Sequence, residues 1–238
     1  MNRHSAVPRT LALEQVFRYA RAMARPRTFS IDDLLDVAET IVTSGDATGL
    51  TLRALSAASG ASNGSIYHLF RSKEELLARA WLRSSERLGT VAQEAIVAAE
   101  IASGSGVETV VAVAEAPVEF ANRYPASAQL FFAQRSAQVF SADLAPEIRE
   151  AIDEDRARFI AKLRLLAKKM WDRTDGVAVA AITACVVDIP GSLVQRSLTA
   201  GREVDSATVA RIDAAVRAVL ALPLAPPRNT PRTRTEES

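Results

Sequence analysis

Small and polar residues between positions 51 and 73 carry the side chains best suited to contact phosphate oxygens and base edges. Hydroxyl, Tyr, His, Lys and Arg groups donate to phosphate, while Arg and Asn side chains can read bases. No Asp or Glu lies between Ala47 and Lys73, so the stretch has no anionic side chain. The candidate contact residues are Thr51, Arg53, Ser62, Asn63, Gly64, Ser65, Tyr67, His68 and Lys73.

Cap residues and apolar periodicity predict four helices around these side chains. Ser30 and Asp33 have the spacing of a capping box, and a stripe of aliphatic residues follows them. Gly60 supplies a turn between two short helices. The four helices are predicted to begin after Ser30, Thr51, Ser62 and Ser72, and the first three end at Gly45, near Ser59 and at Leu69.

Two short helices joined by a glycine turn, after a longer helix, form a helix-turn-helix. In such motifs the second helix lies in the DNA major groove. The second helix here would expose Asn63, Gly64, Ser65, Tyr67 and His68. Because Gly64 has no side chain, the backbone at this position can approach a duplex closely. Thr51 and Ser62 stand at helix N-termini, where backbone N–H groups favour anions, and Lys73 adds a charge at the next one.

The distribution of charge is uneven along the chain. The totals of 29 Lys and Arg and 28 Asp and Glu give a formal net charge of only +1. Residues 1–28, however, contain six Arg and one Glu, and the stretch from Ala47 to Lys73 has a net charge of +3. Such asymmetry favours a polyanionic partner for the N-terminal third of the chain.

Composition argues against several kinds of site. Cys185 is the single cysteine, and it lies in an apolar run, which excludes an internal disulfide and a Cys-based zinc site. The two histidines, His4 and His68, are far apart in sequence. No nucleophile–base pair, metal-ligand cluster or phosphate loop is visible, so we expect no catalytic residue, no metal and no cofactor.

The rest of the chain is predicted to be helical. Ala accounts for 44 of 238 residues, while Gly and Pro number 10 each, and this composition favours an all-α fold. We expect long helices to about Glu100, from Val107 to Arg123, over about 125–140, from Pro146 to Trp171, from Asp175 to about Ala200 with an interruption near Pro190–Gly191, and from Asp205 to before Pro223. No apolar run is expected to reach the length of a membrane span, and no secretory signal is recognisable, so a cytoplasmic protein without membrane contact is expected.

The stretch that runs from Thr51 to Leu76 resembles the DNA-binding module of the tetracycline-repressor (TetR) family. The glycine turn, the Gly-x-Ile-Tyr-His-x-Phe segment and the Ser-Lys-Glu-Glu-Leu helix start occur in the family order, within about residues 29–80. The resemblance implies that Thr51, Tyr67, His68 and Lys73 contact phosphates. It also implies that Arg53, Ser62, Asn63 and Ser65 lie nearest the bases. Asn63 replaces the Lys, Arg or Pro common in the family, and Leu69 replaces a frequent aromatic residue.

The same resemblance implies an all-helical homodimer whose C-terminal domain binds a small effector that releases DNA. The domains would be a basic arm (1–28), the DNA-binding domain (29–80), an effector-binding and dimerisation domain (81–222) and a disordered tail (223–238). The last two helices are rich in Val and Ala and would form the dimer, which sets two recognition helices about 34–36 Å apart on a palindromic operator. Pocket candidates, suited to an apolar or amphipathic effector, are Trp81, Phe120, Tyr124, Phe132 and Trp171.

Two other classes of protein remain open from the sequence. One is a helical enzyme, lipid-binding or small-molecule-binding protein with a repurposed three-helix start. The other is a member of the same family that acts through protein contacts alone. Specific, salt-dependent binding to DNA would separate the leading hypothesis from both.

Overall fold

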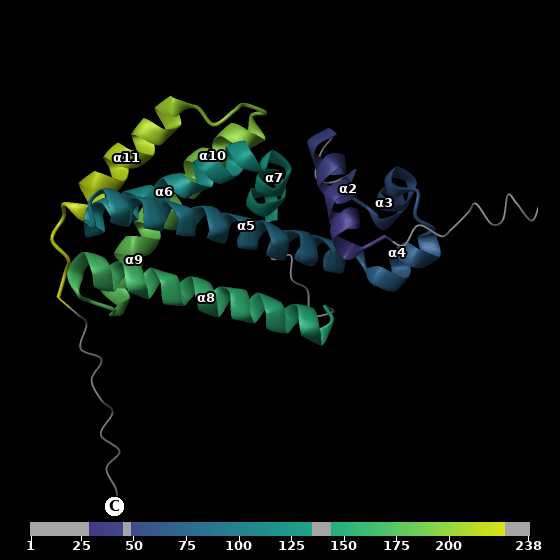
Figure 1. Ribbon diagram of the computed structural model, residues 1–238, viewed down its shortest axis with the longest axis horizontal. Helices are drawn as coiled ribbons and strands as arrows, with labels where there is room; N and C mark the ends of the chain where they lie inside the picture. The colour runs from purple at the N-terminus through teal and green to yellow at the C-terminus, as the bar shows by residue number, and fades with distance from the viewer. Residues whose placement is uncertain (1–28, 45–48, 135–143, 227–238) are drawn as a thin grey trace, which may run out of the picture.

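The computed structural model describes residues 29–44, 49–134 and 144–226, and all regular elements within these ranges are helical, as predicted. The predicted arm lies outside the described residues, as does the tail beyond residue 226. In Figure 1 the first three helices form one end of the molecule and the remaining helices form a larger bundle. The elements are α2 (Ile31–Ser44), α3 (Leu52–Ser59), α4 (Asn63–Leu69), α5 (Lys73–Ala102), α6 (Gly106–Arg123), α7 (Pro125–Gln134), α8 (Pro146–Trp171), α9 (Gly176–Thr183), the π-helix η2 (Ala184–Asp188), α10 (Ile189–Thr199) and α11 (Ser206–Leu220).

The predicted capping residues occupy the predicted helix starts. The backbone N–H of Ser30 donates to Asp33 Oδ2 at 2.9 Å, and the N–H of Asp33 donates to Ser30 Oγ at 3.1 Å, which completes a capping box with Asp in place of Glu. Ser72 Oγ accepts from the N–H of Glu75 at 3.2 Å. These local bonds satisfy backbone donors that the helices leave unpaired, so they fix where α2 and α5 begin.

The N-terminal helices share a core with two helices of the larger bundle. Leu34, Leu55, Ile66 and Phe70 are fully buried together, with Leu76 and Ala80 of α5 and Leu130 of α7. The helix α5 passes without interruption across the predicted domain boundary at residue 80. A displacement of α5 or α7 therefore acts directly on the core that supports α3 and α4.

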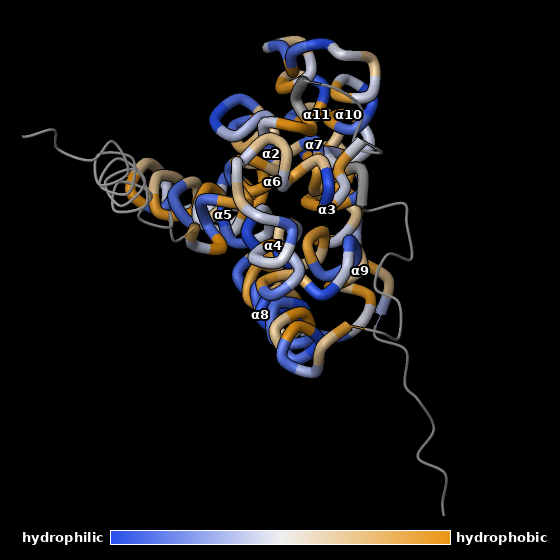
Figure 2. Tube along the Cα trace, turned by 90° about the vertical axis from the view of Figure 1, so that its right-hand side faces the viewer, coloured by the Kyte–Doolittle hydropathy of each residue, from blue (hydrophilic) through white to orange (hydrophobic). Residues whose placement is uncertain are grey.

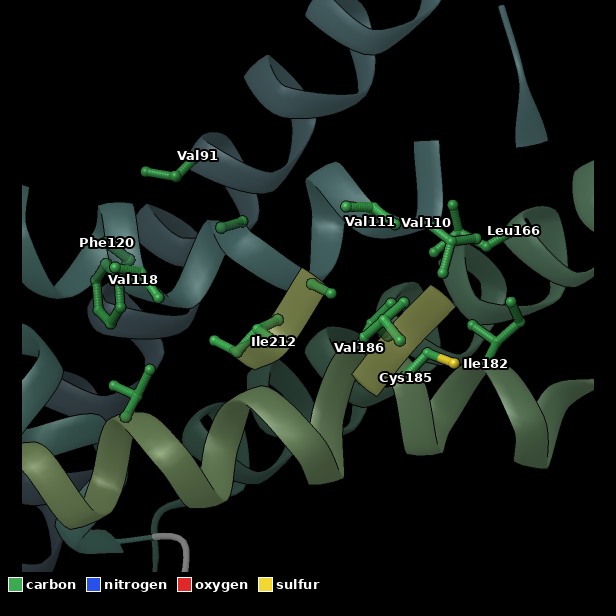
Figure 3. Packing of buried hydrophobic residues seen from close by; sticks show 14 of the residues in the cluster. Val91, Val110, Val111, Val118, Phe120, Leu166, Ile182, Cys185, Val186 and Ile212 are labelled. Atoms are coloured by element: carbon green, nitrogen blue, oxygen red, sulfur yellow. The ribbon is translucent and has the colours of Figure 1, made fainter. Parts of the chain in front are cut away.

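The larger bundle has its own apolar core, drawn in Figure 3. Val110, Phe120, Ile182, Cys185 and Ile212 are among its most deeply buried members and come from α6, α9, η2 and α11. Gly106 begins α6 against α8, where an added Cβ would lie 3.0 Å from the carbonyl oxygen of Lys169 and 3.1 Å from Met170 Cα. The close approach explains why glycine stands at this helix start.

The penultimate helix departs from regular α-geometry slightly earlier than predicted. The irregular segment is the π-helix at Ala184–Asp188, immediately before Pro190. Proline has no N–H to donate to the carbonyl one turn earlier, so the turn before it is the one that loosens. The interruption predicted near Pro190–Gly191 is thus present, but it occupies the residues just before the proline.

The expectation that no segment is long and apolar enough to span a membrane needs correction. Gly176–Thr199 meets the length and composition criteria, with a mean hydropathy of 2.0 in its most apolar window. Length and composition alone mark this segment, and it packs against α6 and α11 of the same chain. The helix predicted over about 125–140 begins at Pro125 and is described to Gln134, so its predicted end lies outside the described residues.

Candidate nucleic-acid interface

The turn between α3 and α4 depends on a glycine in the left-handed region. Gly60 has φ of +74°, and its N–H closes α3 by donating to the carbonyl of Ser56 at 3.0 Å. Ser56 Oγ donates to the carbonyl of Ala61 at 2.7 Å, and this bond holds the residue after Gly60 in place. Because side chains other than glycine are strained at this φ, Gly60 fixes the angle between the two helices.

The helix α4 is anchored on one side and exposed on the other. Ile66 and Phe70 are fully buried in the N-terminal core, while the predicted contact residues of α4 are all exposed. Tyr67 is a large residue with 58% of its surface exposed. Figure 2 views this end of the molecule head-on, with α3 and α4 towards the reader. The exposed residues of α4 are Asn63, Gly64, Ser65, Tyr67 and His68.

The hydroxyl groups at the two helix starts are held in fixed positions. Thr51 Oγ1 accepts from the N–H of Ala54 at 3.0 Å. Ser62 Oγ accepts from the N–H of Ser65 at 3.1 Å and lies 2.9 Å from Ser65 Oγ. Since Thr51 acts only as an acceptor in this bond, its hydroxyl hydrogen can be donated outward to a phosphate oxygen. Arg53 is exposed on α3, and Lys73 is half-buried at the first position of α5.

The internal packing of the protein does not require glycine at position 64. A Cβ added there would meet only Ser62 Oγ, at 3.8 Å, which is an ordinary van der Waals distance. Glycine also lowers the stability of a helix relative to alanine. The lack of a side chain at this position leaves the α4 backbone open to a close approach from outside the chain.

A polar network that sequence reasoning did not foresee joins α2 to the larger bundle. Glu39 of α2 accepts from Arg83 Nη2 at 2.6 Å and from Arg87 Nη1 at 2.8 Å, both on α5. Ser127 of α7, which is fully buried, donates to Glu39 Oε1 at 2.8 Å. Arg83 also donates to Asp36 Oδ1 at 2.8 Å. A sequence signal exists, since both arginines fall in the stripe that Leu76, Ala80 and Val91 form along α5.

The network continues into a group of aromatic side chains. The guanidinium of Arg87 also donates to Ser127 Oγ and lies 4.9 Å from the ring centroid of Tyr124. The Tyr124 and Phe120 ring centroids are 6.2 Å apart, and those of Phe120 and Phe131 are 6.1 Å apart. The Trp81 ring stacks on that of Phe131, with centroids separated by 5.7 Å. Charged groups of α2 and α5 are thus in contact with aromatic groups of the bundle.

Four of the five predicted pocket residues belong to this aromatic group. Phe132 joins through Phe131, at a centroid distance of 5.3 Å. Trp171 does not, because it ends α8 beside the start of α6, whereas Phe120 lies near the end of α6. The rise of an α-helix puts these two ends of α6 about 20 Å apart. The group also contains Phe131, which the sequence analysis did not select. The sequence feature that could have pointed to Phe131 is its position next to Phe132 in a pair of adjacent aromatic residues.

Comparisons with known proteins distinguish the N-terminal helices from the fold as a whole. Residues 34–80 match the family model described as bacterial regulatory proteins, tetR family. The search of curated proteins found no match. Residues 34–80 are thus a tetR-family helix-turn-helix domain, which confirms the resemblance in the sequence.

Solved structures extend the similarity to the whole fold. The TetR family transcriptional regulator PfmR from Thermus thermophilus is 21% identical with a TM-score of 0.58, over 82% of this chain and 97% of that one. A TetR-family member from Streptomyces coelicolor is 25% identical with a TM-score of 0.50, over 79% and 89%. The regulator FadR from Bacillus subtilis, solved in complex with stearoyl-CoA, is 14% identical with a TM-score of 0.55, over 79% and 96%. The chain therefore has the fold of a TetR-family transcriptional regulator, a class of DNA-binding proteins.

Proposed function

We propose that this protein is a ligand-responsive repressor that inserts α4 into the major groove of a palindromic operator. The observation that carries the proposal is the division of α4 into two sides. Two buried anchors, Ile66 and Phe70, fix the helix, and its other side exposes only small or hydrogen-bonding residues. Thr51, Tyr67, His68 and Lys73 would hold phosphates, and Arg53, Ser62, Asn63 and Ser65 would lie nearest the bases.

The C-terminal helices support a two-fold dimer. Val177, Val179 and Leu193 in Gly176–Thr199 are only half-buried within one chain, so each leaves some apolar surface for a partner. Ala210, Ala214 and Ala218 form an exposed stripe along α11, and their small side chains permit close helix–helix contact. A second copy that packs these helices against their counterparts would form a four-helix bundle.

The aromatic group supports an apolar or amphipathic effector. Trp81, Phe120, Tyr124 and Phe132 belong to a group that contacts Arg87, and Arg87 in turn is bonded to Glu39 under the DNA-binding helices. A ligand that separates these rings would move α7 and Ser127, and would thereby alter the position of α2. The complex of FadR with stearoyl-CoA shows that a protein of this fold can hold an amphipathic molecule. In the cytoplasm, such binding would release the operator.

The proposal is tested by titrating duplex DNA from the region upstream of the protein's own gene, at several salt concentrations. We expect specific binding that weakens steeply with salt, because phosphate contacts release counterions. The variants Tyr67→Phe and Lys73→Gln should weaken binding to all sequences, whereas Asn63→Ala and Arg53→Gln should alter the sequence preference. Binding that none of the four variants changes would refute the assignment of α4.

A further inference from the structure

The charges of α8 are separated along its length. The helix contains five acidic residues and one Arg between Pro146 and Asp155. It contains six cationic residues and no acidic one between Arg156 and Trp171. A helix dipole favours this order only in the first and last turns, so it accounts for Glu147 and Lys168 but not for charges in the interior of the helix.

One face of α8 carries this separation and is fully exposed. Ile148, Ile152, Leu163 and Leu166 are buried against the bundle, and α8 lies along its lower edge in both Figure 1 and Figure 2. The opposite face follows the three- and four-residue spacing of a helix-packing seam. Its members are Glu147, Glu150, Glu154, Ala157, Ala161, Arg164, Leu165 and Lys168, and all of them are exposed.

The charges at the two ends of this face have no ion-pair partner among the described residues. Glu147 and Glu150 at one end, and Arg164 and Lys168 at the other, form no such bond there. Lys169, just outside the face, differs because its Nζ lies 2.9 Å from Glu100 Oε1 of α5. Leu165, at the basic end, is an apolar residue with 66% of its surface exposed. The face thus offers charges of both signs and apolar surface that the described part of the chain does not use.

We propose that this face of α8 binds the same face of α8 in a second copy of the chain, in antiparallel orientation. A two-fold axis between Ala157 and Arg158 places Glu147 opposite Lys168 and Glu150 opposite Arg164 and Leu165. Two-fold symmetry forms each of these pairs twice. The small side chains of Ala157 and Ala161 lie at the centre, where the two backbones must come closest. The sequence of this face is therefore complementary to itself.

The charge order favours a second copy over a uniformly anionic partner. A membrane or nucleic-acid surface would attract the basic half of the face and repel Glu147, Glu150 and Glu154. An antiparallel second copy places opposite charges against both the acidic and the basic half of the face. The helix is about 39 Å long, and one helix pair is a small interface, so the association is weak, salt-sensitive and dependent on concentration. It joins dimers that form through other helices, and it does not depend on DNA binding.

Sedimentation velocity of the full chain tests the proposal in the absence of DNA. We expect a concentration-dependent step above the basal species at low ionic strength, which disappears at high ionic strength. The variant E147K/E150K makes both ends of the face basic, and R164E/K168E makes both ends acidic. Each should lower the association constant of this step about tenfold or more, because attraction becomes repulsion at every pair.

A mixture of the two variants provides the decisive result. The basic and acidic faces complement each other, so mixing should restore the step that each variant alone has lost. The control E203K changes an exposed charge in the loop before α11 and should leave the step unchanged. No higher species in the wild type, or equal association in all variants, would overturn the proposal. Loss of association in both variants without restoration on mixing would also overturn it. So would an unchanged association step in R164E/K168E together with weaker binding of this variant to phosphatidylserine vesicles.

Discussion

At the scale of single residues, Gly64 connects the chemistry of the recognition helix with its stability. The position is exposed, and a Cβ there meets no atom of the chain closer than 3.8 Å. Alanine would therefore be accepted by the folded protein and would favour the helix. The proposed close approach of DNA to α4 would account for the glycine.

Replacing Gly64 by Ala should therefore separate stability from DNA affinity. We expect the free energy of unfolding to rise by about 0.5 kcal/mol, because alanine favours a helix, while DNA affinity falls about tenfold. Urea denaturation and fluorescence anisotropy measure the two quantities. Gly89→Ala is the control, since an added Cβ there meets only the flexible end of Lys162, at 3.5 Å. It should stabilise the fold with no loss of DNA affinity. Unchanged DNA affinity in Gly64→Ala would contradict close backbone approach.

Single carboxylates that cap helices should also determine how the stability of the fold changes at acid pH. The hydrogen bond from Arg173, together with those from the N–H groups of Val177 and Ala178, lowers the pKa of Asp175 from 3.8 to about 2. Bonds from Ser30 and Thr208 lower the pKa of Asp33 and of Asp205 in the same direction. Their stabilisation is thus present above the ordinary carboxyl pKa and is lost as the pH falls through the folded value.

The urea midpoint should consequently be constant above about pH 4 and should decrease between about pH 4 and pH 2. Asp175→Asn should flatten part of this decrease, because the amide does not titrate. Circular dichroism at a series of pH values provides the measurement. An identical decrease in the wild type and in Asp175→Asn would show that another group controls acid unfolding.

At the scale of elements, α7 contacts both halves of the molecule. Ser127 bonds to Glu39, Leu130 is buried in the N-terminal core, and Phe131 stacks on Trp81. One short helix thus contacts the polar network, the core beneath α3 and α4, and the aromatic group. This arrangement gives a physical route between the proposed effector site and the DNA-binding helices.

Removing the charge of Glu39 should weaken this connection. In Glu39→Gln the two arginines lose their shared carboxylate, and we expect the free energy of unfolding to fall by about 2 kcal/mol. Glu94→Gln is the matched control, because its ion pair with Arg123 is largely exposed and should contribute no more than about 1 kcal/mol. Chemical denaturation measures both. Equal effects of the two substitutions would contradict a structural role for the network.

The helices themselves could be predicted because their signals are local. Ser30, Thr51, Ser62, Ser72 and Asp205 each stand at a helix start, and all five side chains accept the expected backbone N–H. A cap depends only on residues within one turn, so the sequence contains it directly. The exposed face of α4 follows from the same periodicity.

The contacts between helices could not be predicted in the same way. Glu39 meets Arg83 and Ser127 only after α2, α5 and α7 have packed, at separations of 44 and 88 residues. Trp171 and Phe120 have similar chemistry, yet helix packing places them at opposite ends of α6. The π-helix before Pro190 likewise depends on how the bundle accommodates a missing donor. These features depend on tertiary geometry, which residue types alone do not specify.

At the scale of the whole molecule, the net charge of +1 does not describe the surface that would meet DNA. The described part of the helix-turn-helix, residues 49–73, has cationic side chains at Arg53, Arg71 and Lys73 and no acidic residue. Acidic residues lie elsewhere, including the first half of α8. Affinity for a polyanion is determined by the face that meets it, and α4 with its flanking residues provides such a face.

The central claim is that α4 of two chains reads a palindromic operator. Selection of bound duplexes from a random pool tests it most directly. The wild type should enrich a two-fold symmetric sequence whose half-site centres are about one helical turn, 34–36 Å, apart. Asn63→Lys should enrich the same sequence except at the base pairs nearest residue 63, changed equally in both half-sites. Enrichment of no sequence, or of the same sequence by both proteins, would contradict the account.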